Sequence, residues 1–275
     1  MPLLTQTPRA YGPALFIFTL AFCFSVQPAS ADEFTNFLGM KFVSIPDGKF
    51  IMGAEDEITD AVEAGESPSA ITVTAFQIMP TEVTLAQYKR YIIESARIHL
   101  VTDEFISANS HDDEAPVVYV SWTDARYFLH WLNLNKPDDD QGTYSMPTET
   151  EWEYACRAGS YETYCGGNTA NAVSWNSSQN TAYQQPVARK KANAFGLYDM
   201  SGNVHEWVMD CYGPEHGNLP ARKIKWGFGC QPVKRVVRGG SWNDPPWNAR
   251  ATGQLTVDIN SRSPTIGIRV VRRLP

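Results

Sequence analysis

Three segments of the chain carry the spacing of apolar residues that is typical of amphipathic helices. Apolar side chains recur three and four residues apart in each segment, which places them on one face of a helix. Each segment also begins with a hydroxyl residue that has Gln, Asp or Glu three positions later, the pattern of a capping box. These signals predict helices that begin at Thr84, Ser121 and Thr148, and the last of these should end at Gly159.

Strand patterns in the sequence are short, and long polar stretches separate them. Runs that favour strands occupy residues 49–52, 70–78, 233–238 and 266–272. The intervals 165–180 and 212–229 are rich in Gly, Asn or Pro, and tryptophans spread through the chain can hold such loops by burial. The acidic stretches 55–66 and 138–140 are expected to be solvated surface loops. The pattern predicts one α+β domain over residues 32–275, with much ordered irregular structure.

Residues 1–31 have the composition of an export signal. Arg9 precedes an apolar run at 14–26, and Ala29-Ser30-Ala31 supplies the small residues of a cleavage site. The run is shorter than the roughly 20 apolar residues that a membrane span needs, although an uncleaved N-terminal anchor is the alternative. We therefore predict a signal peptide, a periplasmic or secreted location, and no membrane insertion after cleavage.

The charge of the chain argues against polyanionic partners. The sequence has 23 basic and 30 acidic side chains, a formal net charge of −7. Arg9 is the one charged side chain in residues 1–31, so the remaining chain has a net charge of −8. Because an acidic protein repels phosphate backbones, we expect no nucleic-acid partner.

Four cysteines follow the predicted signal, namely Cys156, Cys165, Cys211 and Cys230. An even number in an oxidising compartment predicts two disulfides, and four cysteines allow three pairings. Short loops favour Cys156–Cys165 and Cys211–Cys230. The alternative is a redox or metal-binding set of thiols, which no C-x-x-C spacing supports.

Two segments, 193–207 and 238–242, are dense in glycines, aromatic residues and polar groups. Neither shows the period of a helix or a strand, so both are expected to be ordered loops. Chains keep such loops rigid where a metal ion or a binding surface requires it. We predict that these two segments form a functional site.

Seven motifs occur in a fixed order along the chain and carry a resemblance to a known family. They include MPTETEWEYA at 146–155 and RGGSW at 238–242, and the others lie at 48–53, 81–88, 116–125, 195–207 and 267–269. The set resembles the formylglycine-generating enzyme, or sulfatase-modifying factor, family over residues 40–272. The resemblance implies a C-type-lectin-like α+β fold with little regular secondary structure.

The family oxidises a cysteine of a sulfatase with O2 and a copper ion that two cysteines hold. The resemblance places those two cysteines at Asp244 and Ala249 of this chain. Neither residue can supply the soft thiolate that Cu(I) prefers, so we expect no copper and no formylglycine-generating copper oxidase. The resemblance is therefore to a cysteine-lacking, PvdO-like branch, in which the PvdO type completes the pyoverdine chromophore by oxidation.

The resemblance also implies a cleft. His205 stands where the family has tryptophan and is a candidate general base or metal ligand, the alternative being a hydrogen-bonded structural histidine. Ser241 matches the family's active-site serine. Asp244 is a candidate catalytic carboxylate, with a turn-forming role as the alternative. Trp242, Trp247 and Arg250 are the predicted substrate-binding residues, and Arg269 is expected to be structural.

A calcium site is implied by the resemblance at Asp199, Gly202, Val204 and Glu206. Hard cations prefer such mixed sets of carboxylate and carbonyl oxygens. Two anionic side chains in so short a loop also repel each other without a cation. The alternative is a loop that water and backbone hydrogen bonds hold.

These features predict an exported oxidoreductase-like protein that matures a peptide-like secreted product, such as a pyoverdine-type siderophore chromophore. Its partner would be a peptide-like small molecule or a protein substrate, and His205 or Asp244 would move protons. One alternative is a non-catalytic, lectin-like module that binds a protein or a glycan. Another is an accessory factor for the assembly of a periplasmic metalloenzyme.

Overall fold

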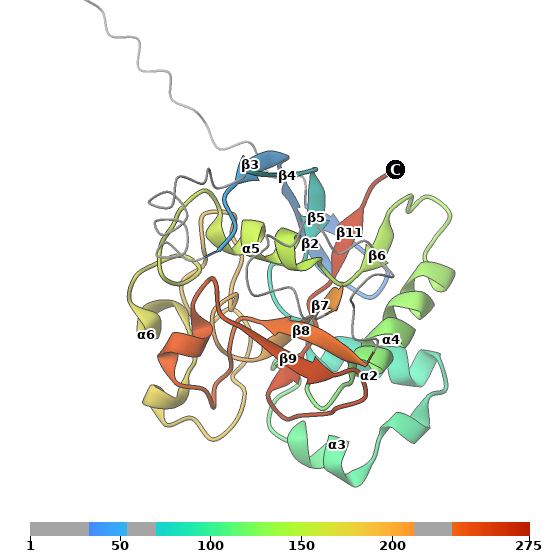
Figure 1. Cartoon of the computed structure of the whole chain (residues 1–275). Helices are drawn as coiled ribbons and strands as arrows, with labels where there is room; N and C mark the ends of the chain where they lie inside the picture. Colours follow the sequence, from blue (N-terminus) through green and yellow to red (C-terminus); the bar gives the residue numbers. More distant parts are fainter. Residues whose placement is uncertain (1–32, 54–69, 212–232) are drawn as a thin grey trace, which may run out of the picture. The chain divides into compact units, whose positions relative to one another are not determined.

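Three sheets frame the part of the chain that the structure describes, which is residues 33–53, 70–211 and 233–275 of a computed structural model (Figure 1). The largest has the order β1-β2-β5-β11-β6, with strands Phe34–Thr35, Lys41–Ile45, Phe76–Ile78, Val271–Arg273 and Thr143–Ser145. The second has the order β10-β7-β8-β9, with strands Ile266–Gly267, His205–Cys211, Lys234–Arg238 and Gln254–Asp258. The third pairs β3, Gly48–Phe50, with β4, Ile71–Val73.

Strands from distant parts of the sequence meet in these sheets. In the largest sheet β11 lies between β5 and β6, with Val271 opposite both Ile78 and Ser145. In the second sheet β10 runs parallel to β7, with Ile266 opposite His205. The end of the described chain therefore holds together segments that begin the fold.

The three predicted helices are confirmed, and each has a complete capping box. They are α2, Leu85–Glu94; α4, Trp122–Asn135; and α5, Glu149–Arg157. The shorter helices are η1, Ile98–Leu100; α3, Asp103–Ala108; α6, Ala170–Val173; η2, Ser177–Gln179; and η4, Pro246–Ala249. In each box the N-cap residue, which precedes the helix, and the third helical residue exchange hydrogen bonds. These bonds satisfy backbone N–H groups that have no partner inside the helix.

Two hydrophobic clusters form the core, and β7 contributes to both. Trp207 belongs to the cluster that includes Tyr88 and Phe128, whereas Val208 packs in the cluster around Trp152. Neighbouring residues of a strand point to opposite faces, so one strand can serve two clusters. The β7 backbone is thereby fixed on both sides, which matters because it carries the candidate site.

Several predicted elements differ from the structure. The runs 70–78 and 266–272 each form two short strands that lie in different sheets. The predicted loop 193–207 ends at Val204, since β7 begins at His205. The prediction that Asp140 is solvated is wrong.

Asp140 is buried because its carboxylate pairs with an arginine of β11. Its Oδ1 accepts hydrogen bonds from the Arg272 Nε at 2.9 Å and from Nη2 at 2.5 Å. The Tyr144 hydroxyl donates to its other oxygen. A buried charge is tolerated when it is paired in this way. An acidic run therefore did not indicate solvent exposure along its whole length.

The predicted disulfide between Cys156 and Cys165 is confirmed, with a Cα–Cα distance of 4.8 Å. It joins the end of α5 to the loop before α6. Cys211 is also disulfide-bonded, and Cys230, its predicted partner, lies outside the described residues. The predicted signal at 1–31 and the loops 55–66 and 212–229 lie outside them as well.

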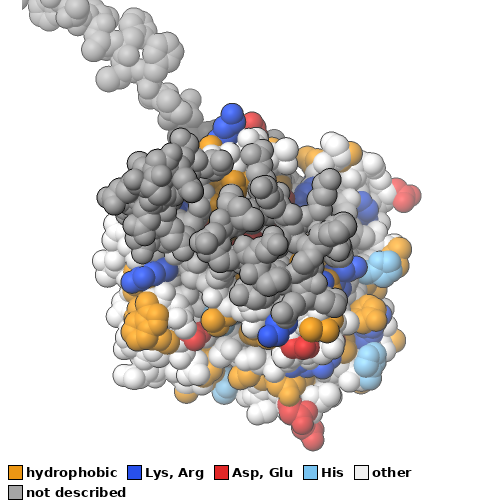
Figure 2. Space-filling model, viewed as in Figure 1, with side chains coloured by type: hydrophobic (Ala, Val, Ile, Leu, Met, Phe, Trp, Pro, Cys, Tyr) orange, Lys and Arg blue, Asp and Glu red, His pale blue; other side chains and the backbone are white. Residues whose placement is uncertain are grey.

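On the face drawn in Figure 2, Lys and Arg side chains are dispersed among Asp, Glu and uncharged residues over the described surface. They do not gather into a continuous basic area there. Among residues 33–53, 70–211 and 233–275, the structure has no helix with the length and apolar character of a membrane span.

Candidate functional site

The first two residues of β7, His205 and Glu206, are both buried and belong to different polar clusters. His205 bonds to Asp244 in the loop before η4, and Glu206 bonds to Arg269 between β10 and β11. Successive strand residues face opposite sides of a sheet, which separates the two side chains. The first cluster contains the predicted catalytic residues, and the second contains the predicted calcium ligands.

Asp244 is the centre of the first cluster. Its Oδ2 lies 2.9 Å from the His205 Nε2 and also accepts a hydrogen bond from the Ser241 hydroxyl. Its Oδ1 accepts one from the Asn248 side-chain amide at 3.1 Å. The structure thus brings together the three residues that the sequence predicts to be catalytic.

These hydrogen bonds set the charge of Asp244. Burial raises the pKa of this carboxyl group, but the hydrogen bonds from His205 and Ser241 outweigh that effect and lower the pKa to about 2. Asp244 is therefore an anion at neutral pH and has no proton to donate. The proton of the His205–Asp244 hydrogen bond must come from the histidine Nε2.

The other ring nitrogen of His205, Nδ1, is buried within the site. His205 is 5% exposed, and its Nδ1 has no hydrogen-bond partner among the described residues. A neutral imidazole with Nε2 protonated carries a lone pair on Nδ1, and this lone pair can accept a proton. The carboxylate of Asp244 stabilises the imidazolium that would result.

Ser241 does not have the geometry of an activated nucleophile. In a Ser-His-Asp arrangement the histidine stands between the other two residues and takes the serine proton. Here the carboxylate of Asp244 stands in the middle, and the Ser241 hydroxyl donates to it. Ser241 is also fully buried. The arrangement supports proton transfer by His205 rather than attack by serine.

The predicted substrate-binding residues surround this cluster unevenly. Trp242 follows Ser241, and its backbone N–H donates to the Asn203 carbonyl at 2.8 Å. Trp247 lies on η4 and is 62% exposed, so most of its ring is open to a ligand. Arg250 is exposed just after η4, and no described contact joins it to His205 or Asp244.

Asn203 and Asn248 are site residues that the sequence analysis missed. Asn203 adopts a left-handed backbone conformation, with φ of 62°, and its side chain bonds to Gln185 and Glu82. The Gly-Asn pair at 202–203 is a signal for such a conformation. Asn248 orients Asp244 from η4, and it belongs to no motif that would have indicated this role.

Arg269 is the centre of the second cluster, as its predicted structural role implies. Its guanidinium donates three hydrogen bonds to both oxygens of Glu206, at 2.7–2.9 Å. It also donates to the carbonyls of Met79 and Tyr198. The Trp152 indole N–H donates to the Glu206 Oε2 at 2.7 Å. Both oxygens of the Glu206 carboxylate therefore accept hydrogen bonds.

Two further carboxyl groups lie in the second cluster, and each keeps one buried oxygen without a partner among the described residues: Asp199 Oδ1 and Glu82 Oε2. Burial raises the pKa of Asp199 to about 6, against the effect of a hydrogen bond from the Ala188 N–H. Burial, and then the charge of Asp199, raise the pKa of Glu82 well above its usual value. Three carboxyl groups thus share one arginine.

The predicted calcium ligands fit a calcium ion only in part. Asp199 offers an unpartnered oxygen, and Gly202 has the left-handed φ of +79° that the tight turn requires. A side chain at Gly202 would meet the Trp175 carbonyl at 2.2 Å, so the loop needs glycine. Both carboxylate oxygens of Glu206, by contrast, already accept hydrogen bonds from Arg269 or Trp152. A calcium ion bound by Glu206 would have to displace the guanidinium.

The donor set does not fit a copper ion held by two thiolates. Asp244 offers a carboxylate that is already paired, and Ala249 offers a buried methyl group. Within the described ranges, no group of three or more His, Cys, Asp or Glu residues is close enough to hold a metal ion. No step of a reaction is assigned to copper on these residues.

Comparison with known proteins agrees with the α+β fold. The description "Sulfatase-modifying factor enzyme 1-like domain" matches residues 27–274. The chain therefore belongs to the sulfatase-modifying factor, or formylglycine-generating enzyme, family. The solved structure of PvdO from Pseudomonas aeruginosa is 27% identical, covers 89% of this chain and 98% of its own, and superposes with a TM-score of 0.69.

Two curated relatives show how varied the family is. The serine/threonine-protein kinase pkn1 of Chlamydia caviae is 27% identical over 84% of this chain and 38% of its own length. The inactive C-alpha-formylglycine-generating enzyme 2 of Mus musculus is 26% identical over 82% of this chain and 84% of its own. This chain spans less than half the length of the first three curated relatives that it matches.

Proposed function

We propose that this protein acts after export in the oxidative maturation of a peptide-like product, with His205 as the general base. The observation that carries the proposal is the unpartnered, buried Nδ1 of His205, behind which an ionised Asp244 holds the ring. A base held in this way can take a proton from a bound substrate. Trp242 and the exposed Trp247 would supply the flat apolar surface for an aromatic or peptide group.

The proposed reaction removes two hydrogen atoms from the substrate. His205 accepts one as a proton, and the two electrons with the second proton pass to dioxygen, which becomes hydroperoxide. The hydroperoxide takes up a proton from solvent to give hydrogen peroxide. The proton on His205 returns to solvent when the product leaves. The likeness to PvdO, which extends over 89% of this chain, supports a siderophore chromophore of the pyoverdine type as the substrate.

The proposal is tested by deletion of the gene and restoration with variants that still fold. The deletion strain should secrete a siderophore or peptide that is heavier by two hydrogen atoms, and His205→Gln should fail to restore the mature product. His130→Gln, a change at an exposed histidine of α4, should restore it fully. An unchanged spectrum of secreted metabolites in the deletion strain would contradict the proposal.

A purified system separates catalysis from an indirect role. The wild-type protein, mixed with the product that accumulates in the deletion strain, should consume dioxygen and form hydrogen peroxide in equal amounts. Asp244→Asn should slow this turnover by about 10²–10⁴-fold, because the general base loses its oriented partner. Turnover that survives in both the His205 and the Asp244 variant would rule out the dyad.

A second candidate function is a non-catalytic binding module. The relative that is named as inactive matches 82% of this chain, which supports a scaffold that persists without catalysis. In that case Trp247→Ala should abolish binding of the secreted product or of its protein carrier, while no variant changes its chemical state. Loss of turnover with retained binding in His205→Gln would favour the enzyme instead.

We also propose structural calcium at Asp199 and the carbonyls of Gly202 and Val204, with Glu206 exchanging its arginine contact on binding. A ligand that binds only the folded state raises the melting temperature. Added Ca²⁺ at millimolar concentration should therefore stabilise the wild type against a chelator control, and Asp199→Ala should remove the difference. Equal melting curves of the wild type with Ca²⁺ and with chelator would reject this site.

A further inference from the structure

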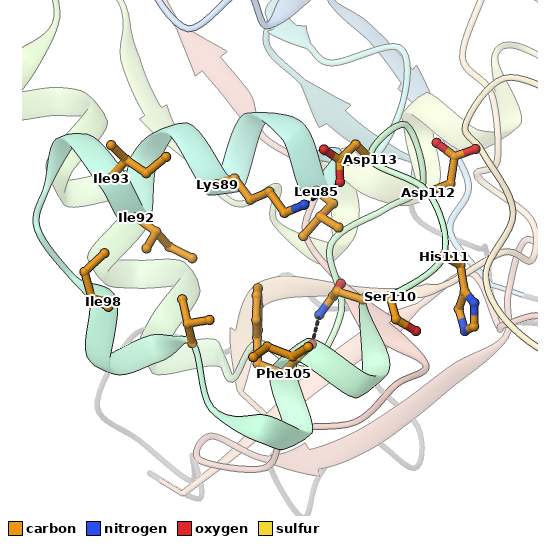
Figure 3. Close-up of a pocket in the computed structure, with 13 residues that line it drawn as sticks. Leu85, Lys89, Ile92, Ile93, Ile98, Phe105, Ser110, His111, Asp112 and Asp113 are labelled. Atoms are coloured by element: carbon orange, nitrogen blue, oxygen red, sulfur yellow. Dashed lines mark hydrogen bonds and ion pairs between the residues drawn. The ribbon is translucent and has the colours of Figure 1, made fainter.

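A cavity lies between α2, η1 and α3, and none of the candidate site residues lines it (Figure 3). It encloses about 940 Å³. Cavities that bind small molecules typically measure roughly 300–1,000 Å³, so this one has room for a ligand of moderate size. We call it the apolar cavity.

The floor and one rim of the apolar cavity are hydrocarbon. Leu85, Ile92 and Phe105 form a buried floor. On the rim, Ile98 is 61% exposed and Ile106 is 52% exposed. Isolated surface isoleucines are ordinary, but exposed isoleucines that continue into a buried apolar floor form a surface that gains free energy when it is covered.

Hydrogen bonds to residues outside the gap help to hold the walls of the apolar cavity in place. The Asn109 side chain at the end of α3 accepts from the Val118 N–H and donates to the Val118 carbonyl, both at 3.0 Å. On the other wall, the Leu85 N–H donates to the Ala115 carbonyl at 2.9 Å. Because each wall is anchored outside the gap, the cavity is preformed and a ligand need not open it.

The opposite end of the apolar cavity is polar and carries an excess of negative charge. Figure 3 shows the Lys89–Asp113 pair at this end, with Asp112 and His111 further along the same loop. The Lys89 ammonium lies 2.5 Å from the Asp113 carboxylate, so these two charges cancel. Asp112 forms no ion pair among the described residues, although its Oδ1 accepts a hydrogen bond from the Glu114 N–H at 2.9 Å. Glu114, two positions after Asp112, is exposed. The polar end therefore favours a cation.

We propose that the apolar cavity binds a linear aliphatic chain that carries a cationic head group. The chain would lie on Ile92, Ile98 and Phe105, and its ammonium group would pair with Asp112. An anionic head would meet the excess of carboxylates, and a head without charge would gain nothing from Asp112. The inference is independent of the function proposed for His205, since the two sites share no residue.

Three probes with the same tail test the tail and the head separately. Decylammonium, decanol and decanoate should be titrated into the full protein by calorimetry at low salt and below their micellar concentrations. Decylammonium should bind about two- to five-fold more tightly than decanol, the range expected for one exposed ion pair. Decanoate should bind more weakly than decanol. Absence of binding by all three probes, or tightest binding of decanoate, would overturn the proposal.

Variants at exposed positions identify the cavity as the binding site. Ile98→Asp should weaken decylammonium by about tenfold or more, because the tail would contact a charge that must stay hydrated. Asp112→Asn should remove the preference for decylammonium over decanol without abolishing decanol binding. Leu134→Asp, at a 69% exposed position of α4 outside the cavity, is the matched control and should change nothing.

The same variants distinguish a ligand from a second copy of the chain. If the wild type sediments as a dimer and Ile98→Asp is a monomer, the exposed isoleucines form a self-interface and the proposal is wrong. Unchanged probe affinities in Ile98→Asp, with folding confirmed by circular dichroism, would also reject it. If Asp112→Asn still binds decylammonium more tightly than decanol, the assigned position of the head group is wrong.

Discussion

His205 and Glu206 are neighbours on one strand and are both buried, yet their surroundings differ in one decisive respect. Both carboxylate oxygens of Glu206 accept hydrogen bonds from Arg269, and one of them also from Trp152. His205 is held from one side by Asp244, and its Nδ1 has no partner among the described residues. A saturated group holds a fold together, whereas a group that is oriented but left open at one atom can act on a ligand.

The comparison shows that burial and charge do not by themselves distinguish a structural cluster from a reactive one. A missing hydrogen-bond partner adds information, because a buried polar atom without one costs about 1–3 kcal/mol. It has to be combined with the neighbours of the group, since the hydroxyls of Tyr88 and Tyr91 in the hydrophobic core also lack a partner among the described residues. The unpartnered Nδ1 makes His205 the candidate reactive residue of the two, whereas Glu206 has the contacts of a structural residue. Asp199 and Glu82, each with one unpartnered oxygen, stand between the two cases.

Replacement of Arg269 by Met should have the largest effect on stability. It would leave Glu206 unpaired in the interior beside Glu82 and Asp199, and breaking a buried ion pair costs about 3–5 kcal/mol. Urea denaturation at pH 7 should show a loss of this size. Arg250→Met, at an exposed arginine, should change the free energy of unfolding by less than about 0.5 kcal/mol. Equal stabilities of the two variants would mean that Arg269 does not support Glu206.

Asp199→Asn should stabilise the protein at pH 7 when calcium is removed. The folded pKa of about 6 lies above the unfolded value near 3.9, so the stability that Asp199 contributes at low pH is lost as pH rises through 6. Asparagine keeps an oxygen for the Ala188 N–H and has no charge. We expect the free energy of unfolding to rise by an amount on the order of 2 kcal/mol at pH 7, and to depend less on pH between pH 4 and 6. Urea denaturation at several pH values measures both. Asp47→Asn, at an exposed aspartate, should leave the profile unchanged.

Asp244 should show the opposite dependence on pH. Its folded pKa of about 2 lies below the unfolded value, so its contribution is present above about pH 4 and is lost as pH falls toward 2. Because its side chain is 23% exposed, solvent weakens the contribution to about 1 kcal/mol. Asp244→Asn should remove this part of the decrease in unfolding free energy at acid pH, as measured by urea denaturation. If the variant keeps the wild-type dependence of unfolding free energy on pH below pH 4, another group is responsible for it.

His205→Gln should have the smallest effect on stability, although it should abolish turnover. Glutamine can still donate a hydrogen bond to Asp244. The Nδ1 atom, which the substitution removes, has no hydrogen-bond partner among the described residues. We expect the free energy of unfolding to change by less than about 1 kcal/mol. A loss as large as that of Arg269→Met would place His205 in the frame of the fold and would remove the contrast with Glu206.

The sequence predicted the parts of the fold that depend on local signals. The capping boxes at Thr84, Ser121 and Thr148 start helices in the structure, because they satisfy backbone groups that any helix start leaves open. The pairing of Cys156 with Cys165 also follows from a short separation. Such features need few distant residues, so a single sequence suffices to find them.

The features that the sequence failed to predict depend on distant partners. Asp140 reads as solvated in an acidic run, but Arg272 buries it from a strand far along the chain. Glu206 reads as a calcium ligand, and the charge that competes with calcium comes from Arg269. The grouping of His205, Ser241 and Asp244 rested on family resemblance, since no spacing in the sequence shows that they meet.

The contacts of Arg269 have a consequence for the order in which the protein can form. Its guanidinium bonds to the Met79 carbonyl across 190 residues of sequence, and the same group neutralises Glu206. Loop closures of this length are slow to form. A growing chain therefore cannot bury the acidic cluster until its last strands have been synthesised.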